Sequence, residues 1–592
     1  MTAKQENPAA KRPRPPAHGK PLLPAKEQQA AGQGISKPTV ASPALKPEAI
    51  KLDIHKEFAE HSVAEFFKKN RQMLGYSGKI KSLTTLVHEY VTNSIDACEE
   101  ARITPDIFVK IEQIGLEHYK VVVEDNGPGI PKKIIGKALG KMLAGTKFNR
   151  FQQARGQQGI GAAGCVMYGQ ITTGKPTKVV TSSGSNTIYE ADLTLDTKTN
   201  EPKVANEKEY PGHMRGLRIE TEVKDVIFQN SDQNAFEYLR RTALANPHVK
   251  ITFISPDNIT TVWDRAVSQM PKPPKPTLPH PKGITTDDLL SMASRTTARS
   301  VKSFLTTEFT RMSSQKANEI QGKVSFDMEK RAKDMNWEEA EQVVNAVKQL
   351  DFIAPPTDVL IPIGEDHLSK ALDSVLKPEY KCVITRSPSV YRGGVPFIVE
   401  IGLAYGGKAG RQIEAPKEGD AKEIDRMEIM RFANRVPLLF DSGSCALTQA
   451  VQSIDWKRYD IRPEIPITVI VNFTSIYVPY TGAGKQAVSD EEEVVKDIRL
   501  AIMDAARSVG RYVSGQARKY DREEKMKMLL LYVEPVAEAI STLTGKPQKV
   551  LEKKIENLIE TKFGEYVDSG EDENDVKGNN GEPEEAGSEA AD

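Results

Sequence analysis

The sequence predicts an α+β protein in which two α/β blocks are separated by a helical segment. In the first block, from about residue 107 to 254, short β-branched runs are interspersed with amphipathic helical patterns. Helices packed on one side of a mixed sheet fit this pattern better than a doubly wound fold does. A proline-rich linker at 271–276 leads into a purely helical segment. The second block begins at about residue 355 and ends in a long helical pattern.

Length and charge set the outer limits of the interpretation. The 592 residues are enough for about three to five domains. Lysine plus arginine and aspartate plus glutamate both total 81, so the net charge indicates no particular partner. Residues 1–50 carry 8 basic and 3 acidic side chains, whereas 568–592 carry 10 acidic and 1 basic. Charge blocks of this kind are typical of disordered tails, and we expect both ends to be disordered.

The cysteines and the apolar runs indicate a compartment. Cys98, Cys165, Cys382 and Cys445 are far apart and match no metal-binding spacing, so we expect four buried thiols in a reducing cytosol. No apolar run approaches the roughly 20 residues that span a bilayer. The N-terminus also lacks the hydrophobic core of a signal peptide. We therefore expect a soluble intracellular protein.

A helical pattern at 86–97 carries the most informative polar residues. Glu89, Asn93 and Asp96 follow one another at intervals of four and three, which stacks them on one helix face. A carboxylate one turn before a carboxamide suits a general base beside a ligand for a hard cation. A solvated helix face is the alternative. The other face is apolar enough to dock on a sheet, with Leu83, Leu86, Val87, Val91 and Ile95.

Two further motifs follow this helix, which is itself preceded by an amphipathic helical pattern at 58–74. A strand at 119–124 ends at Asp125 in the sequence Asp-Asn-Gly-Pro-Gly, so Asp125 is expected at a strand end facing a cleft, although the motif is also simply a good turn. Gly156, Gly159 and Gly161 then precede an apolar helix. Closely spaced glycines before a helix let main-chain N–H groups converge on an anion.

Two common nucleotide-binding motifs are excluded. Residues 159–164 fit the dinucleotide fingerprint, but no strand precedes them and no acidic residue lies about 20 positions later. A Walker loop is missing because the Gly-Lys pairs at 484–485 and 545–546 are followed by Gln and Pro.

The remaining elements complete the predicted order. In the helical segment, basic side chains at Arg299, Lys302, Arg311 and Lys316 indicate either a nucleic-acid face or ordinary solvated charge. The predicted strands are 107–112, 177–181, 186–193, 216–223, 249–254, 397–401 and 465–473, and the predicted helices are 234–245, several within 283–350, 490–541 with breaks, and 548–563.

The order of the three motifs resembles the ATP-binding fold shared by gyrase-type topoisomerases, Hsp90 chaperones, histidine kinases and MutL proteins. The resemblance implies that Glu89 activates the attacking water, that Asn93 holds Mg²⁺ and that Asp125 accepts the adenine amino group. It also implies a glycine lid around the triphosphate. The implied nucleotide contacts are Thr146, Lys147, Gly156, Gln157, Gln158, Gly159, Ile160, Gly161, Ala162 and Ala163.

Five later motifs resemble the B-subunit family of DNA topoisomerase VI. They are 278–283 (Leu-Pro-His-Pro-Lys-Gly), 355–364, 392–397, 456–459 (Trp-Lys-Arg-Tyr) and 478–481. This resemblance implies a Bergerat-type ATP-binding sandwich at 51–270, a helix-two-turns-helix domain at 271–352 and a transducer domain at 353–545. A disordered tail at 1–50 and a charged helix with an acidic tail at 546–592 flank them.

The family resemblance also implies a mechanism. Lys457 would reach from the transducer to the γ-phosphate, where its charge could sense hydrolysis. ATP would close two B subunits over a DNA duplex, with residues 58–81 in the dimer contact and two A subunits cleaving DNA in a heterotetramer. We would then expect a nucleoid-associated cytoplasmic protein. Leu217 occupies the position at which many relatives of the ATP-binding fold have a threonine that supports adenine. We therefore do not include a side-chain contact with adenine at this position.

Two alternative functions remain open at this stage. One is a MutL-like DNA repair ATPase, and the other is a non-hydrolysing scaffold that resembles the topoisomerase B subunit. Glu89, Asn93 and Lys457 argue against the scaffold.

Overall fold

The computed structural model describes residues 69, 71–72, 75–142, 151–156, 159–196, 199–412, 425–482 and 484–563. The two predicted tails lie outside this range, as does the predicted helix at 58–74 apart from Lys69, Arg71 and Gln72. Within the described part of the chain, no helix combines the length and the apolar composition that crossing a membrane requires.

An eight-stranded sheet forms the first block. Its spatial order is β5-β4-β3-β6-β2-β1-β7-β8, and every described pairing is antiparallel except that of β1 with β7. The strands are β1 (Asp106–Gly115), β2 (His118–Asp125), β3 (Thr177–Ser183), β4 (Thr187–Leu195), β5 (Pro202–Pro211), β6 (Arg215–Lys224), β7 (Lys250–Ile254) and β8 (Thr260–Trp263).

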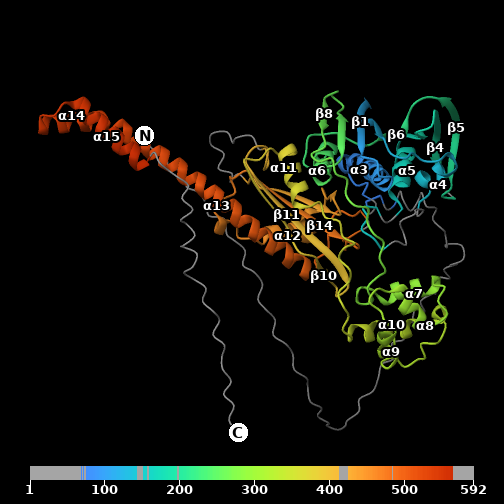
Figure 1. Ribbon diagram of the computed structural model, residues 1–592. Helices are drawn as coiled ribbons and strands as arrows, with labels where there is room; N and C mark the ends of the chain where they lie inside the picture. The colour runs from blue at the N-terminus through green and yellow to red at the C-terminus, as the bar shows by residue number, and fades with distance from the viewer. Residues whose placement is uncertain are drawn as a thin grey trace, which may run out of the picture. The chain divides into compact units, whose positions relative to one another are not determined.

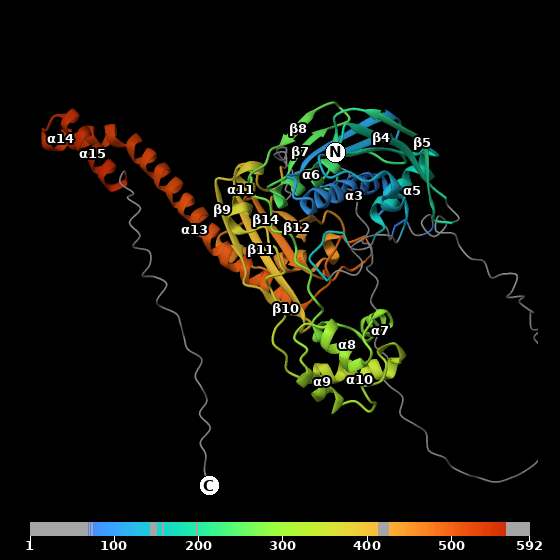
Figure 2. The same cartoon turned by 45° about the vertical axis from the view of Figure 1, so that its right-hand side comes forward.

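Three helices cover one face of this sheet, as the predicted α+β sandwich requires (Figure 2). They are α3 (Lys79–Glu100), α5 (Gly161–Thr173) and α6 (Ala235–Ala245); the short η1 (Lys132–Ile134) and α4 (Ile135–Gly140) lie between β2 and α5. The predicted apolar face of α3 is confirmed, because its five side chains are at most 1% exposed. Burial of this face against the sheet leaves the polar face of α3 for the site.

The helical segment folds around its own apolar core (Figure 1). It contains η2 (Pro281–Gly283), α7 (Thr286–Arg295), α8 (Val301–Glu308), α9 (Ser314–Gln321), η3 (Ala332–Asp334) and α10 (Trp337–Lys348). Each α-helix starts after a Thr, Ser or Asn whose side chain accepts an N–H of the first turn. Thr285 and Asn336 complete capping boxes with Asp288 and Glu339.

The start and the end of the helical segment meet. His280 Nε2 lies 3.2 Å from the carbonyl oxygen of Ile353, and Arg311 Nε donates to the carbonyl of Ala354 at 3.1 Å. Gly283 also approaches Gly394 so closely that a β-carbon on Gly394 would overlap the nitrogen of Gly283. This close backbone approach gives the glycines of the Leu-Pro-His-Pro-Lys-Gly and Arg-Gly-Gly motifs a packing reason.

A six-stranded sheet forms the second block. Its order is β10-β11-β14-β12-β13, with β9 also paired to β11. The central β11 and β14 are buried almost throughout, and α12 and α13 pack beside them. The elements are α11 (Glu365–Val375), β9 (Tyr380–Thr385), β10 (Ser389–Tyr391), β11 (Val395–Tyr405), β12 (Glu428–Ala433), β13 (Val436–Pro437), η4 (Ser442–Ser444), α12 (Ala446–Gln452), η5 (Trp456–Tyr459) and β14 (Ile467–Ser475).

The predicted long helix is α13 (Glu492–Leu531), followed by α14 (Val533–Thr544) and α15 (Gln548–Phe563) (Figure 1). The buried residues of α13 all lie in its first 22 residues, up to Val513, where it packs on β11 and β9. The break falls at Tyr532. Large apolar side chains are exposed beyond it and just before it, among them Leu531, Leu543 and Tyr532.

Some elements and burial states differ from the prediction. The strands β5, β8, β9, β10, β12 and β13 and the helices α4, α11 and α12 were not predicted. β5 is an exposed edge strand of mostly polar residues, so it has no apolar alternation to detect. The four cysteines are free thiols, but Cys382 is only half-buried because it lies on β9, whereas the other three are buried as expected.

Candidate nucleotide-binding site

The polar face of α3 forms one wall of the site. Glu89 is half-buried, Asn93 is exposed and Asp96 is buried, so the three residues differ in surroundings although they share a helix face. The half-buried carboxylate and the exposed carboxamide lie one turn apart, which leaves both accessible from the same side.

The N-terminus of α5 meets Glu89. Gly161 is the first residue of α5, and the Glu89 carboxylate fills the space that a side chain at 161 would take, since a β-carbon there would overlap Glu89 Oε2. Among the residues that the structure describes, no side chain caps this end of the helix. Gly159, two residues earlier, has a φ of +60°, which favours glycine. The predicted base and the predicted phosphate loop therefore lie together. They meet at a helix N-terminus, which favours negative charge.

Asp125 ends β2 in a fixed orientation. It is 5% exposed; Oδ1 accepts hydrogen bonds from the N–H of Gly127 at 2.9 Å and of Leu217 at 3.2 Å, and Oδ2 accepts one from Ser94 Oγ at 2.8 Å. Burial raises the pKa of Asp125, and these three hydrogen bonds oppose the shift. The Asp125 carboxylate is thereby held in an orientation that suits a hydrogen-bond donor on a nucleobase.

The Gly216–Leu217 pair supports Asp125 through its backbone. Gly216 has a φ of +116°, and a β-carbon on it would overlap the Asp125 carbonyl oxygen. Leu217 therefore contributes its main-chain N–H, where a threonine would add a hydroxyl. A threonine hydroxyl does lie beside the turn, because Thr181 Oγ1 accepts the N–H of Ile130 at 2.8 Å. The sequence did not predict that Ser94 and Thr181 contact the Asp125 turn, because both residues are distant from Asp125 in the chain.

The other predicted nucleotide contacts are only partly described. Thr146, Lys147, Gln157 and Gln158 lie outside the described residues. Gly156 has open space around it, and Ile160 and Ala162 are half-buried at the start of α5. Ala163 is buried in the core of the first block, so only its backbone is available to a ligand.

The structure does not bring Lys457 to these residues. Lys457 lies exposed on η5, which packs on α13, and among the described residues its side chain has no hydrogen bond or ion pair. Another lysine of the second block, Lys485, lies close enough to α3 for its charge to affect the pKa of His88. Burial lowers the pKa of His88, the neighbour of Glu89; the Glu89 charge opposes this shift, and the Lys485 charge adds to it.

The site suits a metal that is held mainly by a ligand's phosphates. Among the described residues, no three His, Cys, Asp or Glu side chains form a metal-binding group. The exposed carboxamide of Asn93, one turn beyond Glu89 on α3, offers one oxygen ligand. Mg²⁺ is commonly bound by one or two protein ligands plus substrate phosphates, so these residues fit Mg²⁺ with a nucleoside triphosphate.

Comparison with known proteins covers both blocks. The family model described as histidine kinase-, DNA gyrase B- and HSP90-like ATPase matches residues 78–197, and the model for the topoisomerase VI B subunit transducer matches 355–525. The B subunit of type 2 DNA topoisomerase 6 from Thermococcus sibiricus is 45% identical to this chain, and the match covers 89% of this chain and 99% of that protein. The chain belongs to the B-subunit family of topoisomerase VI.

Other members of this family match equally well. The protein of Pyrococcus horikoshii is 46% identical over 86% of this chain and 96% of its own length. That of Methanothermobacter thermautotrophicus is 45% identical over 84% and 94%. The predicted fold, an ATPase sandwich followed by a transducer with a long helix, is confirmed, as is the predicted assignment to the ATPase subunit of a type IIB topoisomerase. A MutL-like protein is excluded as the family of this chain.

Proposed function

We propose that this chain binds ATP with Mg²⁺ between α3, the Asp125 turn and α5, and that Glu89 is the general base of its hydrolysis. The observation that carries this proposal is the position of the Glu89 carboxylate against Gly161, at the N-terminus of α5. A base must lie within reach of the water that attacks the terminal phosphate. A helix N-terminus is a suitable place for that phosphate.

Asp125, Asn93 and the backbone at the start of α5 have separate roles in this proposal. The Asp125 carboxylate, oriented by Ser94, Gly127 and Leu217, accepts a hydrogen bond from the adenine amino group. Asn93 contributes an oxygen ligand to Mg²⁺, which neutralises charge on the phosphates. Main-chain N–H groups between Gly159 and Ala163 bind the phosphate oxygens.

Hydrolysis then follows from the placement of Glu89. Its carboxylate takes a proton from water as the water oxygen attacks the γ-phosphorus, and the bond to the β-phosphate oxygen breaks to release ADP. The half-buried position of Glu89 favours this step because partial exclusion of water strengthens its electrostatic interactions.

A cation from the transducer completes the site. The sequence pointed to Lys457, whereas the electrostatic effect of Lys485 on His88 favours Lys485 for the contact with the γ-phosphate. Both lysines lie in the matched transducer region. A point charge there stabilises the negative charge that develops in the transition state.

At the level of the assembly, ATP binding closes two copies of this chain over a DNA duplex, and a partner A subunit cleaves the DNA. The relatives are named as the B subunit of their enzyme, which supports a second kind of subunit. Exposed apolar side chains near the junction of α13 and α14 offer a surface for it. We place the resulting assembly of two A and two B subunits on cytoplasmic nucleoid DNA.

The test combines this chain with a cognate A subunit, supercoiled DNA, Mg²⁺ and ATP. We expect ATP-dependent relaxation that requires both chains. Glu89→Gln should bind a non-hydrolysable ATP analogue normally and lose hydrolysis by about 10²- to 10⁴-fold, the usual contribution of a general base. Relaxation without ATP or without this chain would contradict the proposal, and unimpaired hydrolysis by Glu89→Gln would remove Glu89 from its role.

A further inference from the structure

Two residues shortly before the glycine run, Gln153 and Ala154, are bound to the transducer. Gln153 makes two hydrogen bonds with the backbone of Ile361: Nε2 donates to its carbonyl at 3.0 Å, and Oε1 accepts its N–H at 2.6 Å. The carbonyl of Ala154 accepts a hydrogen bond from Asn434 Nδ2 at 3.1 Å. The chain therefore leaves the transducer surface immediately before Gly156.

Arg155 binds the same segment to α3. Its guanidinium donates to Asp96 Oδ1 at 2.6 Å, to the two oxygens of Glu99 at 2.9 and 2.7 Å, and to Asn246 Oδ1 at 2.7 Å. The side chain is 8% exposed. Asp96 lies one turn beyond Asn93 on the proposed ligand-binding face of α3, so Arg155 connects the start of the glycine run to the helix that carries Glu89.

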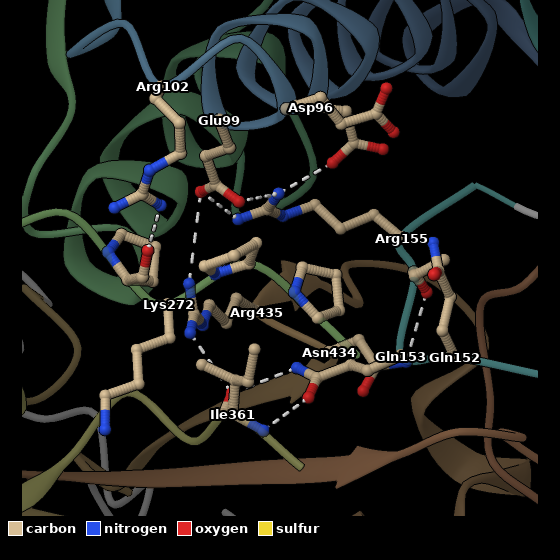
Figure 3. A pocket seen from close by; sticks show the side chains of 15 residues that line it. Asp96, Glu99, Arg102, Gln152, Gln153, Arg155, Lys272, Ile361, Asn434 and Arg435 are labelled. Carbon is tan, nitrogen blue, oxygen red and sulfur yellow. Dashed lines mark hydrogen bonds and ion pairs between the residues drawn. The ribbon is translucent and has the colours of Figure 1, made fainter. Parts of the chain in front are cut away.

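Glu99 joins this connection to the transducer (Figure 3). Besides Arg155, its carboxylate accepts the Nε2–H of His248 at 2.8 Å and lies 3.9 Å from Arg435 Nη1. Arg435, 7% exposed, also donates to the carbonyls of Ile361 and Pro362, both at 3.1 Å. Glu99 and the two arginines line a cavity of about 360 Å³.

We propose that Arg155, Glu99, Arg435 and Gln153 form a positioning cluster that couples the start of the phosphate loop to the transducer. The inference rests on the proposed ATP site. A buried charge that loses its partner is strongly unfavourable, so the members of this cluster shift together or not at all. An arrangement of this kind passes a change at one site to another because both sites bias the same set of contacts.

A second ion pair across the same interface offers a matched control. Arg240 Nη2 on α6 donates to Glu428 Oε1 on β12 at 2.7 Å, and its other hydrogen bonds go to Glu237 on its own helix. A cluster that only holds the two domains together would behave as this pair does. A cluster that carries a signal from the phosphate loop would not.

The experiment compares Gln153→Ala and Arg435→Gln with Arg240→Gln in the full chain. Binding of a non-hydrolysable ATP analogue is measured directly, and hydrogen exchange is followed in transducer peptides around 359–364 and 436–440. We expect analogue affinities within about twofold of wild type for all three variants. Wild type and Arg240→Gln should show an analogue-dependent change in exchange, which Gln153→Ala and Arg435→Gln should lose.

Steady-state kinetics provide a second readout. Gln153→Ala and Arg435→Gln should lower kcat by about tenfold, within the usual range of coupling energies, with little change in KM. Gln153→Ala removes no charge, so it keeps the test valid where Arg435→Gln destabilises the fold. Arg435→Lys, which keeps the charge, should restore part of the response.

The outcomes separate this inference from the proposed function. Wild type that fails to bind the analogue defeats the proposed ATP site itself. Wild type that binds it without any exchange change in the transducer overturns the coupling role, as do variants that respond like Arg240→Gln. Equal losses in all three variants would mean that the cluster only stabilises the interface.

Discussion

At Gly161, the lack of a side chain allows a carboxylate to lie against the first turn of a helix. The space belongs to Glu89, and any β-carbon would displace it. Glycine is therefore required at this position by a tertiary contact.

Replacing Gly161 with alanine should impair hydrolysis by displacing the base. We expect Gly161→Ala to lower kcat by at least about tenfold, because displacement of a reacting group by about 1 Å can cost up to 10²-fold. Gly515→Ala, at an exposed position of α13, is the control, since a β-carbon at Gly515 meets no atom within 4 Å. Steady-state ATPase assays of both variants test this, and equal activities would show that Glu89 tolerates the displacement.

His248 makes stability depend on pH. Burial lowers its pKa, although the hydrogen bond with Glu99 opposes the shift. Below its ordinary pKa of about 6.5, the unfolded chain takes up a proton that the folded chain does not. The free energy of unfolding therefore falls as pH drops from about 6.5 toward the lower folded-state pKa.

Chemical denaturation between pH 7 and pH 5 tests this expectation. His248→Gln should show a shallower loss of stability on acidification than wild type. His213→Gln, in which the replaced side chain is at least partly exposed, should follow wild type. Parallel curves for wild type and His248→Gln would rule out the linkage.

At the scale of elements, the two candidates for the lysine that contacts the γ-phosphate lie on different parts of the transducer. Lys485 is in the loop after β14, and Lys457 is on the short helix η5. Lys485→Ala should lower hydrolysis by about 10²-fold with little loss of nucleotide binding, which is typical of a group that stabilises the transition state. Lys457→Ala, from the exposed η5, should have the smaller effect. Single-turnover ATP hydrolysis separates the two, and the reverse order would restore the sequence-based assignment of Lys457.

The sequence predicted well those features that depend on local pattern. The faces of α3, the Asp125 turn and the glycines before α5 all follow from periodicity or turn chemistry within a few residues. Lys457 was selected by resemblance alone, and Gly484–Lys485 was weighed only as a Walker loop. The effect of the Lys485 charge on His88 could not be predicted, because the fold alone brings these two distant parts of the chain together.

Features that depend on distant contacts were missed for a physical reason. β12 is mostly buried but contains Glu428 and Arg431, which obscure its apolar pattern. Both charges are satisfied from elsewhere, Glu428 by Arg240 and Arg431 by the carbonyl of Phe440. The contacts of Arg155 with Asp96 and Glu99 span 59 and 56 residues, and no local periodicity reports such pairs.

At the scale of the whole molecule, the ATPase sandwich and the transducer share apolar contacts as well as ion pairs. Leu244 and Ala245 of α6 are buried with Leu368 and Leu372 of α11 in one cluster. Leu439 and Phe440 of the transducer are buried in the core of the first block. The positioning cluster thus lies within an interface that already has its own apolar packing, so its charges need not hold the domains together.

The exposed apolar surface near the end of α13 should serve the A subunit. The double variant Leu531→Ser and Leu543→Ser, at side chains 79% and 85% exposed, should weaken the affinity for a cognate A subunit at least about tenfold. ATP hydrolysis by this chain alone should be unchanged. Ile259→Ser, which alters an exposed apolar residue of the first block, is the control. Unchanged affinity for the A subunit would place the contact elsewhere.

The meeting of His280 with Ile353, and of Arg311 with Ala354, has a consequence for the evolution of this protein. The two ends of the helical segment lie together, and the segment has an apolar core of its own. It therefore has the arrangement of a domain inserted into a loop, which we call the cassette. A lineage could lengthen, exchange or delete such a cassette without changing the register of either sheet. The ATP-driven machinery and the inserted module are therefore free to diversify at different rates.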